Sequence, residues 1–286
     1  MKKYITISIA VFVILAIFLS YVFSGRIILP QLFHLGPLAI RYYGLILALA
    51  AASGFYLAIK RSVLYGLDKK IAEDILFWVI VGGFIGARLY HVLSSAPYYW
   101  QHPIDIIKVW NGGLSIYGAV LGGIIIVWWL AKRYKLNAIS LLDWLTPCVL
   151  LGQIIGRFGN LFNYEAFGYP TSLPWKMFVP LNFRPFAYEK FNFFHPWFLY
   201  EALGNLVILI FLLKILEPKL KKSSPGFLAF FYLLLYNCLR FGLEFLRIDS
   251  TILGIFRLNA IVSLIFVLVS VSVLTVIDKN EQKLKK

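Results

Sequence analysis

The chain has 286 residues, of which 60% are hydrophobic and only 14% are charged; its mean hydropathy is +0.80 and its formal net charge is +15. Soluble domains are about 45–50% apolar and about 25% charged, so this composition excludes a soluble globular protein and a disordered chain. The two cysteines, Cys148 and Cys238, lie inside apolar runs and exclude a secreted disulfide scaffold. The remaining class is an all-α polytopic membrane helix bundle.

Eight apolar runs approach the roughly 20 residues that a helix needs to cross a bilayer. In chain order the predicted spans are 4–23, 40–59, 71–95, 113–131, 140–163, 196–216, 226–246 and 258–277. The first follows Met1-Lys2-Lys3 as the core of a signal peptide would, but no small-x-small cleavage site comes after it. We therefore expect residues 1–29 to form an uncleaved signal-anchor span, whose removal would leave seven spans.

The basic residues are distributed unevenly between the connections. Seventeen of the 28 lysines and arginines lie before the first predicted span, after the second, fourth and sixth spans, and in the C-terminal segment that ends in the basic tail 281–286. In an eight-span bundle these segments share one side, so the positive-inside rule predicts that both termini are cytoplasmic. The positive charge is therefore mainly a topology signal, and we expect no nucleic-acid partner.

Two connections on the other side are rich in aromatic residues. Residues 164–195 contain four prolines and few charges, and residues 96–112 have the same character. Amphipathic rings favour the headgroup level of a membrane, so 164–195 is expected to form an extracytoplasmic arm of one membrane domain covering 30–280. The alternative is that both segments are ordinary aromatic belts.

Three arginines, Arg88, Arg157 and Arg240, fall within or at the edge of predicted spans. A charge near the bilayer centre costs roughly 2.5–3.5 kcal/mol on insertion scales, so each is a functional-site candidate. Arg157 and Asn160 are three residues apart and share a helix face, with Glu165 at the outer end of the span. One interpretation is a phosphate-binding site, because the planar guanidinium of Arg157 suits phosphate. The alternative is an Arg157–Glu165 ion pair that only fixes two helices together.

A second cluster lies on the seventh predicted span. Steps of four, four and three residues put its members on one helix stripe: Tyr236, Arg240, Glu244 and Arg247. One interpretation is a cationic ligand site in which Glu244 orients Arg240. The other is a self-compensating ion pair of the kind that is common on helices.

Further polar groups accompany these clusters. Glu201 lies inside the sixth span and is expected to pair with an arginine of another span, while His195, at its start, is more often structural than catalytic in such a position. Tyr43 begins the second span, and Tyr117 offers a phenol for proton transfer. Gly118 and Gly122 form a small-xxx-small pair suited to close helix packing.

Together these residues suit an anionic ligand that enters from the lipid, and a phospholipid headgroup fits. The phosphate would meet the arginines while the acyl tails stay between helices. The sequence has no metal-ligand cluster, no H-E-x-x-H and no P-loop, so we predict no metal and no cofactor.

At these residues the sequence resembles the bacterial prolipoprotein diacylglyceryl transferases, over roughly residues 30–280. Residues 156–168, GRFGNLFNYEAFG, match the family signature G-R-x-G-N-x-x-N-x-E-x-x-G at every fixed position. GPLAIRYYG at 36–44 and HPWFLYE at 195–201 resemble two further motifs, and Tyr236, Arg240 and Glu244 fall on a late Y-x-x-x-R-x-x-x-E pattern.

The resemblance implies an enzyme of the bacterial cytoplasmic (inner) membrane. It would transfer the diacylglyceryl group of phosphatidylglycerol to the lipobox cysteine of a prolipoprotein, forming a thioether and releasing glycerol phosphate. The implied partners are phosphatidylglycerol, prolipoprotein signal peptides with a lipobox cysteine, and membrane lipids.

On this reading Arg157 and Arg240 hold the phosphate, Asn160 positions it, and Glu165 and Glu244 orient the arginines. The candidates for proton transfer or headgroup contact are Tyr43, Tyr117, Tyr236 and His195, and the remaining substrate-binding candidates are Arg88, Glu201 and Arg247. One position departs from the family pattern, which usually has a histidine where this chain has Tyr117. Either Tyr117 takes the place of that histidine, or another group does its work, or the chain is a divergent paralogue with altered activity.

Two other functions are consistent with buried arginines. A transporter or lipid flippase would move its ligand without releasing glycerol phosphate. A structural membrane subunit would use the polar pairs only to fix helix packing, so that neutral replacements would change stability rather than turnover. The signature at 156–168 favours the enzyme over both.

Overall fold

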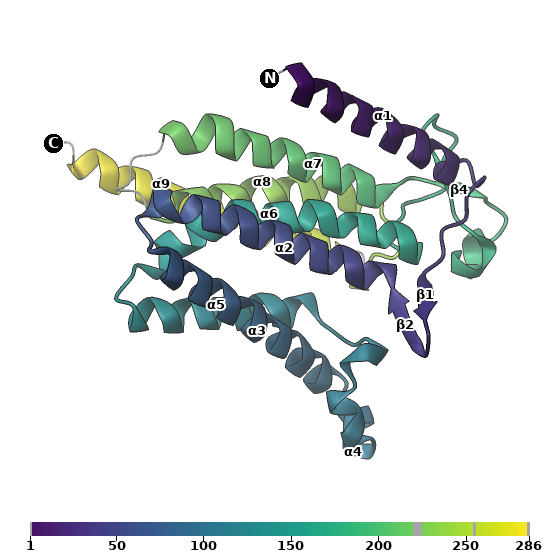
Figure 1. Cartoon of the computed structure of the whole chain (residues 1–286), viewed down its shortest axis with the longest axis horizontal. Helices are drawn as coiled ribbons and strands as arrows, with labels where there is room; N and C mark the ends of the chain where they lie inside the picture. Colours follow the sequence, from purple (N-terminus) through teal and green to yellow (C-terminus); the bar gives the residue numbers. More distant parts are fainter. Residues whose placement is uncertain (1, 220–224, 254–255, 285–286) are drawn as a thin grey trace. The chain divides into compact units, whose positions relative to one another are not determined.

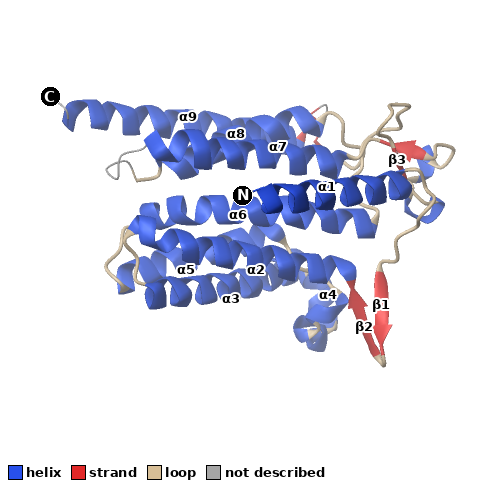
Figure 2. Ribbon diagram, turned by 45° about the horizontal axis from the view of Figure 1, so that its top comes forward, coloured by secondary structure: helices blue, strands red, loops and turns tan. Residues whose placement is uncertain are grey.

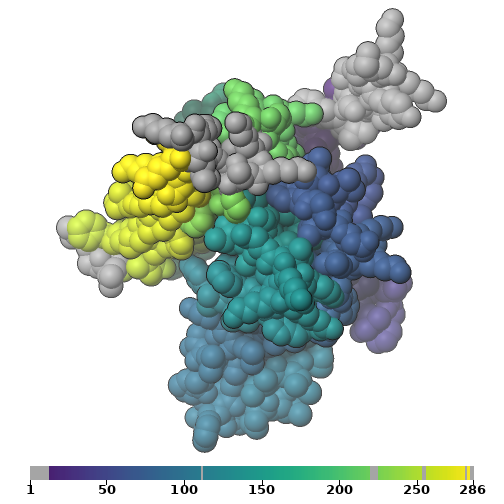
Figure 3. All heavy atoms as spheres, turned by 90° about the vertical axis from the view of Figure 1, so that its left-hand side faces the viewer, coloured from purple at the N-terminus to yellow at the C-terminus, as the bar shows by residue number. Residues whose placement is uncertain are grey.

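The chain is mostly helical. A computed structural model describes residues 2–219, 225–253 and 256–284, without the side chains of 2–12, 111, 253, 281 and 284; the remainder is grey in Figure 3. The main helices, labelled in Figure 1, are α1 (Lys2–Phe23), α2 (Tyr42–Ser62), α3 (Lys69–Ser94), α4 (Ala96–Gln101), α5 (Ile116–Arg133), α6 (Ala138–Asn163), α7 (Trp197–Phe211), α8 (Phe227–Glu244) and α9 (Leu258–Leu284).

Seven helices of the described residues are long and apolar enough to cross a membrane. They comprise Tyr42–Tyr65, Lys69–Ser94, Ile116–Arg133, Ala138–Asn163, Trp197–Lys219, Phe227–Glu244 and Leu258–Asn280. These match the second to eighth predicted spans to within a few residues, which confirms the polytopic helical class. Helix α1 covers the predicted signal-anchor span at 4–23, but its side chains are described only from Val13 on, and the apolar portion Val13–Phe23 is shorter than a span. The extra span and the cytoplasmic termini therefore stay predictions.

Short antiparallel strand pairs, red in Figure 2, interrupt the helices. The first pair joins β1 (Leu32–Leu35) to β2 (Leu38–Arg41), and β2 leads directly into α2. In the segment 164–195, β3 (Met177–Phe178) pairs with β4 (Phe193–Phe194); β5 (Ile252–Leu253) pairs with β6 (Phe256–Arg257) just before α9. The segment 164–195 is therefore a folded loop with its own hydrogen bonds.

The chain forms two compact units. The first unit consists of Met1–Ala52, Leu150–Lys219 and Phe230–Lys286, and the second of Ser53–Val149 and Leu220–Ala229. The first unit has a core where the end of α1, the end of α6, the loop 164–195 and the start of α7 meet; fully buried members include Val179, Phe194 and Phe198. This core fixes the ends of the helices that carry the candidate site.

The second unit has its own core, in which Ile75, Leu130 and Trp144 are fully buried. Side chains cap the starts of α3 and α8. Asp68 accepts from the backbone N–H of Lys70 at the start of α3, and Asp143 accepts from the N–H groups of Gly226 and Ala229 at 2.6 and 2.8 Å at the start of α8.

Helices α3 and α5 approach each other closely and lie side by side in Figures 1 and 2. A Cβ atom on Gly118 would lie 2.2 Å from the carbonyl oxygen of Gly86, and one on Gly122 would lie 2.3 Å from that of Gly82. The predicted small-xxx-small pair thus faces a second glycine pair across the helix contact. Only glycine permits this backbone approach.

This contact predicts a sharp difference between two neighbouring residues of α5. Gly122→Ala should lower the free energy of unfolding by about 1–3 kcal/mol, because α3 and α5 must move apart. Gly123→Ala should change it by less than about 1 kcal/mol, in the stabilising direction, because alanine favours helix and its Cβ would meet Val79 at an ordinary 3.8 Å. Denaturant unfolding of both variants in detergent measures the difference, and equal stabilities would contradict the close approach.

Candidate functional site: a buried carboxylate that joins two arginines

Glu201, on the first turns of α7, lies at the centre of the polar cluster in the first unit. Its side chain is 0% exposed. Oε1 accepts from Nη2 of Arg157 on α6 at 2.7 Å and from the Tyr236 hydroxyl on α8 at 3.2 Å, and Oε2 accepts from Nη1 of Arg240 on α8 at 3.0 Å. The prediction that Glu201 pairs with an arginine of another span is confirmed, with two arginines rather than one. One carboxylate therefore joins three helices.

Arg157 also belongs to a hydrogen-bonded chain along the end of α6. Its Nη1 donates to Oδ1 of Asn160 at 3.4 Å, and Nδ2 of Asn160 donates to Oε1 of Glu165 at 2.8 Å. Asn163 donates to the same Glu165 oxygen at 3.2 Å. The ion pair of Arg157 is with Glu201 and its link to Glu165 runs through Asn160, so the simple Arg157–Glu165 lock is not what the structure shows.

Arg240 has a second carboxylate beside it. Its Nη2 lies 3.6 Å from Oε2 of Glu244, one turn further along α8. Oε1 of Glu244 accepts from Nδ2 of Asn259 on α9 at 2.9 Å, whereas Oε2 is buried without a hydrogen-bond partner among the described residues. The predicted pair of Glu244 and Arg240 is therefore present as a looser ion pair, anchored from α9.

Arg247 lies beyond the end of α8, which is at Glu244, so the predicted four-residue stripe does not run along one helix to its end. The guanidinium binds Asp249 through two hydrogen bonds, Nε to Oδ1 at 2.5 Å and Nη2 to Oδ2 at 2.9 Å. Burial raises the pKa of the Asp249 carboxyl, but the bonded Arg247 guanidinium outweighs it and holds that pKa below its ordinary value. The Arg247 backbone forms a bridge with Gly168.

Two glycines of the sequence signature permit close contacts at the site. A Cβ on Gly159 would lie 2.7 Å from Cδ2 of Tyr43, so the Tyr43 ring packs directly on the α6 backbone beside Asn160. A Cβ on Gly168 would lie 2.5 Å from the carbonyl oxygen of Leu246. These contacts explain locally why the signature requires glycine at both positions.

His195 joins the loop 164–195 to the start of α7. Its backbone N–H donates to the Tyr169 carbonyl at 3.0 Å, and its carbonyl accepts from the Gly168 N–H at 2.9 Å. Its Nδ1 lies 3.0 Å from the Tyr200 hydroxyl, which accepts from Nε1 of Trp175 at 2.8 Å. These contacts are those of a structural clamp.

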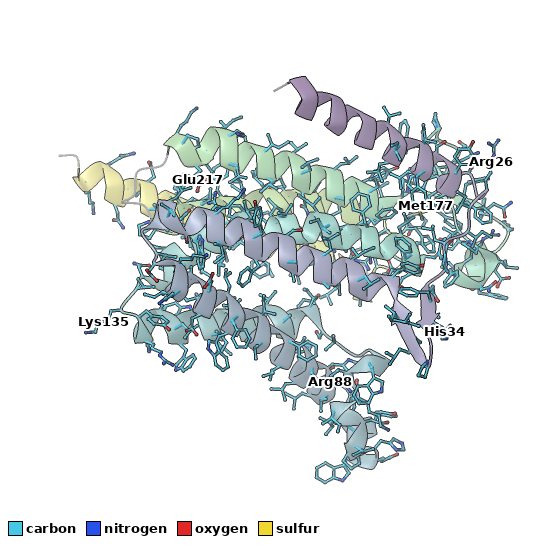
Figure 4. The ribbon with its side chains drawn as sticks, in the orientation of Figure 1. Arg26, His34, Arg88, Lys135, Met177 and Glu217 are labelled. Carbon is cyan, nitrogen blue, oxygen red and sulfur yellow. The ribbon has the colours of Figure 1, made fainter. Side chains whose placement is uncertain are left out.

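Arg88 and Tyr117 belong to the second unit. The Arg88 guanidinium donates to four backbone carbonyls: to Ile106 at 2.8 Å, Gly112 at 2.7 Å, Gly113 at 2.9 Å and Asp105 at 2.5 Å. The side chain, labelled in Figure 4, thus fastens the aromatic segment 96–112 to α3. It borders a cavity of about 160 Å³ that is lined by Arg88, His91, Tyr98, Tyr99, Asp105, Lys108, Gly112 and Gly113.

Tyr117 is 59% exposed on the first turn of α5, and its ring lies 6.0 Å from that of Tyr90. It has no hydrogen-bonded partner among the side chains that the structure describes. Its role as a substitute for the family histidine stays a prediction.

Several residues of the cluster escaped the sequence analysis. Trp197 is fully buried with three guanidinium groups around its ring, Asp249 binds Arg247, and Asn259 binds Glu244. Trp197 stands next to His195-Pro196 at the start of an apolar span, where an aromatic residue is indistinguishable from a membrane-interface anchor. Asn259 is a polar residue at the start of the last apolar span, and such a position is a sequence signal for a polar partner on another helix.

The arrangement can bind an anion. The carboxylates of Glu201 and Glu244 are at most 1% exposed, whereas the side chains of Arg157 and Arg240 are 26% and 13% exposed. Hydrogen bonds to described residues use two of the five N–H donors of Arg157 and one of those of Arg240. The arginines therefore keep unused donors and some exposed surface, while the Glu201 and Glu244 carboxylates are buried and those of Glu165 and Asp249 are exposed.

Comparison with known proteins agrees with the motifs. The family model described as prolipoprotein diacylglyceryl transferase matches residues 30–276. A protein of Synechococcus elongatus is 39% identical over 239 residues, covering 82% of this chain and 83% of its own length; one of Fervidobacterium nodosum is 38% identical over 277 residues, covering 94% of each chain. One of Thermotoga maritima is 36% identical over 274 residues, covering 95% of this chain and 92% of its own. All three are named phosphatidylglycerol–prolipoprotein diacylglyceryl transferase.

The His195 clamp predicts a specific loss of stability in acid. Burial lowers the pKa of the His195 imidazole below its ordinary value of about 6.5, so between the two values the unfolded chain binds more protons than the folded one. The free energy of unfolding should therefore fall as the pH drops below about 6.5, until the lowered pKa is passed. His195→Gln should flatten this slope between pH 7 and pH 5, whereas His34→Gln, at an exposed histidine of β1, should not. Equal slopes in both variants and the parent would contradict the clamp.

Proposed function

The chain belongs to the prolipoprotein diacylglyceryl transferase family, and from that membership we propose that it transfers the diacylglyceryl group of phosphatidylglycerol to a cysteine thiol of a prolipoprotein. The observation that carries the proposal is the pair of arginines held by Glu201, whose side chains are partly exposed and whose donors are only partly used by described residues. A phosphodiester offers oxygens that match planar guanidinium donors. We further propose that the thiol is a lipobox cysteine and that the enzyme acts in the bacterial inner membrane.

The reaction exchanges one bond for another. The cysteine sulfur attacks the glyceryl carbon that carries the phosphate, a carbon–sulfur bond forms, and the bond between that carbon and the phosphate oxygen breaks. Glycerol phosphate leaves with the bonding electron pair. The thiol proton passes to an acceptor and ultimately to the leaving phosphate or to water, so the reaction needs no oxidant or reductant.

The arginines favour this step because negative charge grows on the phosphate. The bound phosphodiester carries one negative charge, and bond cleavage adds a second to the departing oxygen. Donors already fixed at that place stabilise the transition state more than the ground state. Glu201 holds Arg157 and Arg240 through hydrogen-bonded ion pairs, so their guanidinium planes need not reorganise during the reaction.

The thiol needs a proton acceptor, because the thiolate is the nucleophile and a free cysteine has a pKa of about 8.5. The Tyr236 hydroxyl donates its hydrogen to Glu201, so we do not assign it as the acceptor of the thiol proton. A tyrosine accepts a proton only as its phenolate, which a nearby cation favours, and we propose the phenolates of Tyr43 and Tyr117 as the candidate acceptors. Tyr43 packs on Gly159 beside Asn160, and Tyr117 occupies the position of the family histidine.

Removal of either arginine should abolish most of the activity. Arg157→Ala and Arg240→Ala are expected to lower kcat by about 100-fold or more, as losing one preorganised donor of an oxyanion site does. The assay measures glycerol phosphate released from phosphatidylglycerol in the presence of a lipobox peptide. The control is Arg26→Ala, at an exposed arginine that stacks on Tyr21 and is labelled in Figure 4; it should retain full activity.

Full activity in both arginine variants would refute the assignment. A purified wild-type chain that moves phosphatidylglycerol between leaflets without releasing glycerol phosphate would be a flippase instead. A lipobox peptide with serine in place of cysteine should give no release, and unchanged release with it would refute the thiol as acceptor.

The two phenols can be separated by substitution. Tyr43→Phe and Tyr117→Phe each remove one hydroxyl while keeping the ring. Substitution of the tyrosine that accepts the proton should lower kcat by about 100-fold to 10,000-fold, and substitution of the other tyrosine should leave turnover nearly normal. Normal turnover in both variants would exclude both phenols as the acceptor.

A further inference from the structure

The Trp197 indole is fully buried at the first residue of α7. Its Nε1 donates to the carbonyl oxygen of Leu243 on the last turn of α8 at 2.7 Å. The same carbonyl also accepts from the backbone N–H of Leu246, just beyond the end of α8, at 3.1 Å. The ring is therefore fixed to both α7 and α8.

Three guanidinium groups surround this ring. The Cζ atoms of Arg240, Arg247 and Arg157 lie 4.7, 5.1 and 5.7 Å from its centroid. All three distances are within the roughly 6 Å over which a cation is attracted to an aromatic face. The arginines come from α6, from α8 and from the segment after α8, so the ring is a contact that all three share.

The chemical nature of this contact matters for an anion site. Each arginine already has a carboxylate: Glu201 joins Arg157 and Arg240, Glu244 lies beside Arg240, and Asp249 binds Arg247. A further carboxylate among them would repel a phosphate. An indole attracts the three cations through its π face, carries no net charge, and is the strongest of the aromatic side chains in this respect.

We propose that Trp197 is a positioning residue that holds Arg157, Arg240 and Arg247 as one three-armed site for the phosphodiester headgroup. The proposal rests on the function proposed above and adds two points to it. Arg247 belongs to the phosphate site, and the indole face sets the spacing of the three arginines. Loss of the face should therefore lower kcat more than it raises KM, since spacing matters most where phosphate charge develops.

The test compares Trp197→Leu and Trp197→Phe with Trp144→Leu. The Trp144 indole is a matched control in the second unit, because it is also fully buried and donates through Nε1 to a backbone carbonyl, that of Ala58, at 2.9 Å. We expect Trp197→Leu to lower kcat by about 30-fold, and Trp197→Phe, which keeps an aromatic face, by less than about 5-fold. Trp144→Leu should shift the unfolding midpoint without a comparable change in kcat per folded enzyme.

A second measurement keeps the shape of the ring constant, so that it does not depend on the folding of Trp197→Leu. The eight tryptophans are replaced during expression by mono- and difluorotryptophan, which weakens the π face progressively. kcat should fall stepwise with fluorination in the wild-type chain and stay constant in the Trp197→Phe chain. Equal responses of the two chains, or a kcat of Trp197→Leu within twofold of wild type, would overturn the proposal.

Failure of the proposed function gives a different result. If the wild-type chain releases no glycerol phosphate, the proposed function fails, and calorimetric titration with glycerol 1-phosphate then tests the site alone. Weaker binding by about tenfold in Trp197→Leu than in Trp144→Leu supports the three-armed site. Equal binding in the two variants overturns it.

Discussion

A carboxylate with no exposed surface inside a membrane bundle must be compensated, and this requirement organises the candidate site. Removing a charge from water costs several kcal/mol, and only close, hydrogen-bonded partners offset it. Glu201 meets this requirement with Arg157, Arg240 and the hydroxyl of Tyr236, so α6, α7 and α8 must come together for the carboxylate to be buried at all. The ion pairs thus specify how these three helices associate.

The same compensation leaves the arginines suited to bind a ligand. The carboxylates of Glu201 and Glu244 are buried, whereas the side chains of Arg157 and Arg240 keep some exposed surface and donors that no described residue uses. Arg88 differs from these two arginines, because its guanidinium donates to four backbone carbonyls and fastens the segment 96–112 to α3. Buried arginines in this chain therefore differ in what they can do, according to whether carboxylates or carbonyls hold them.

The sequence predicted the class, seven spans to within a few residues, and most members of the first-unit cluster, because long apolar runs and intramembrane charges are local signals. It predicted an arginine partner for Glu201 but not the pair, since tertiary packing decides which helices meet. It placed Arg247 on the stripe of Arg240, although α8 ends at Glu244. Trp197 escaped notice because its importance lies in three contacts from elsewhere in the chain, which no residue spacing near it reveals.

The central claim is that the negative charge of Glu201, rather than its shape, holds the two arginines for the phosphate. The most direct test is kcat for glycerol phosphate release by folded Glu201→Gln, measured beside Glu189→Gln at an exposed glutamate of the loop 164–195. We predict a loss of about two orders of magnitude in Glu201→Gln, because a broken buried ion pair costs about 3–5 kcal/mol and part of that falls on the arrangement of the arginines. Glu189→Gln should match the wild type. A Glu201→Gln enzyme that turns over as fast as the wild type would contradict the account.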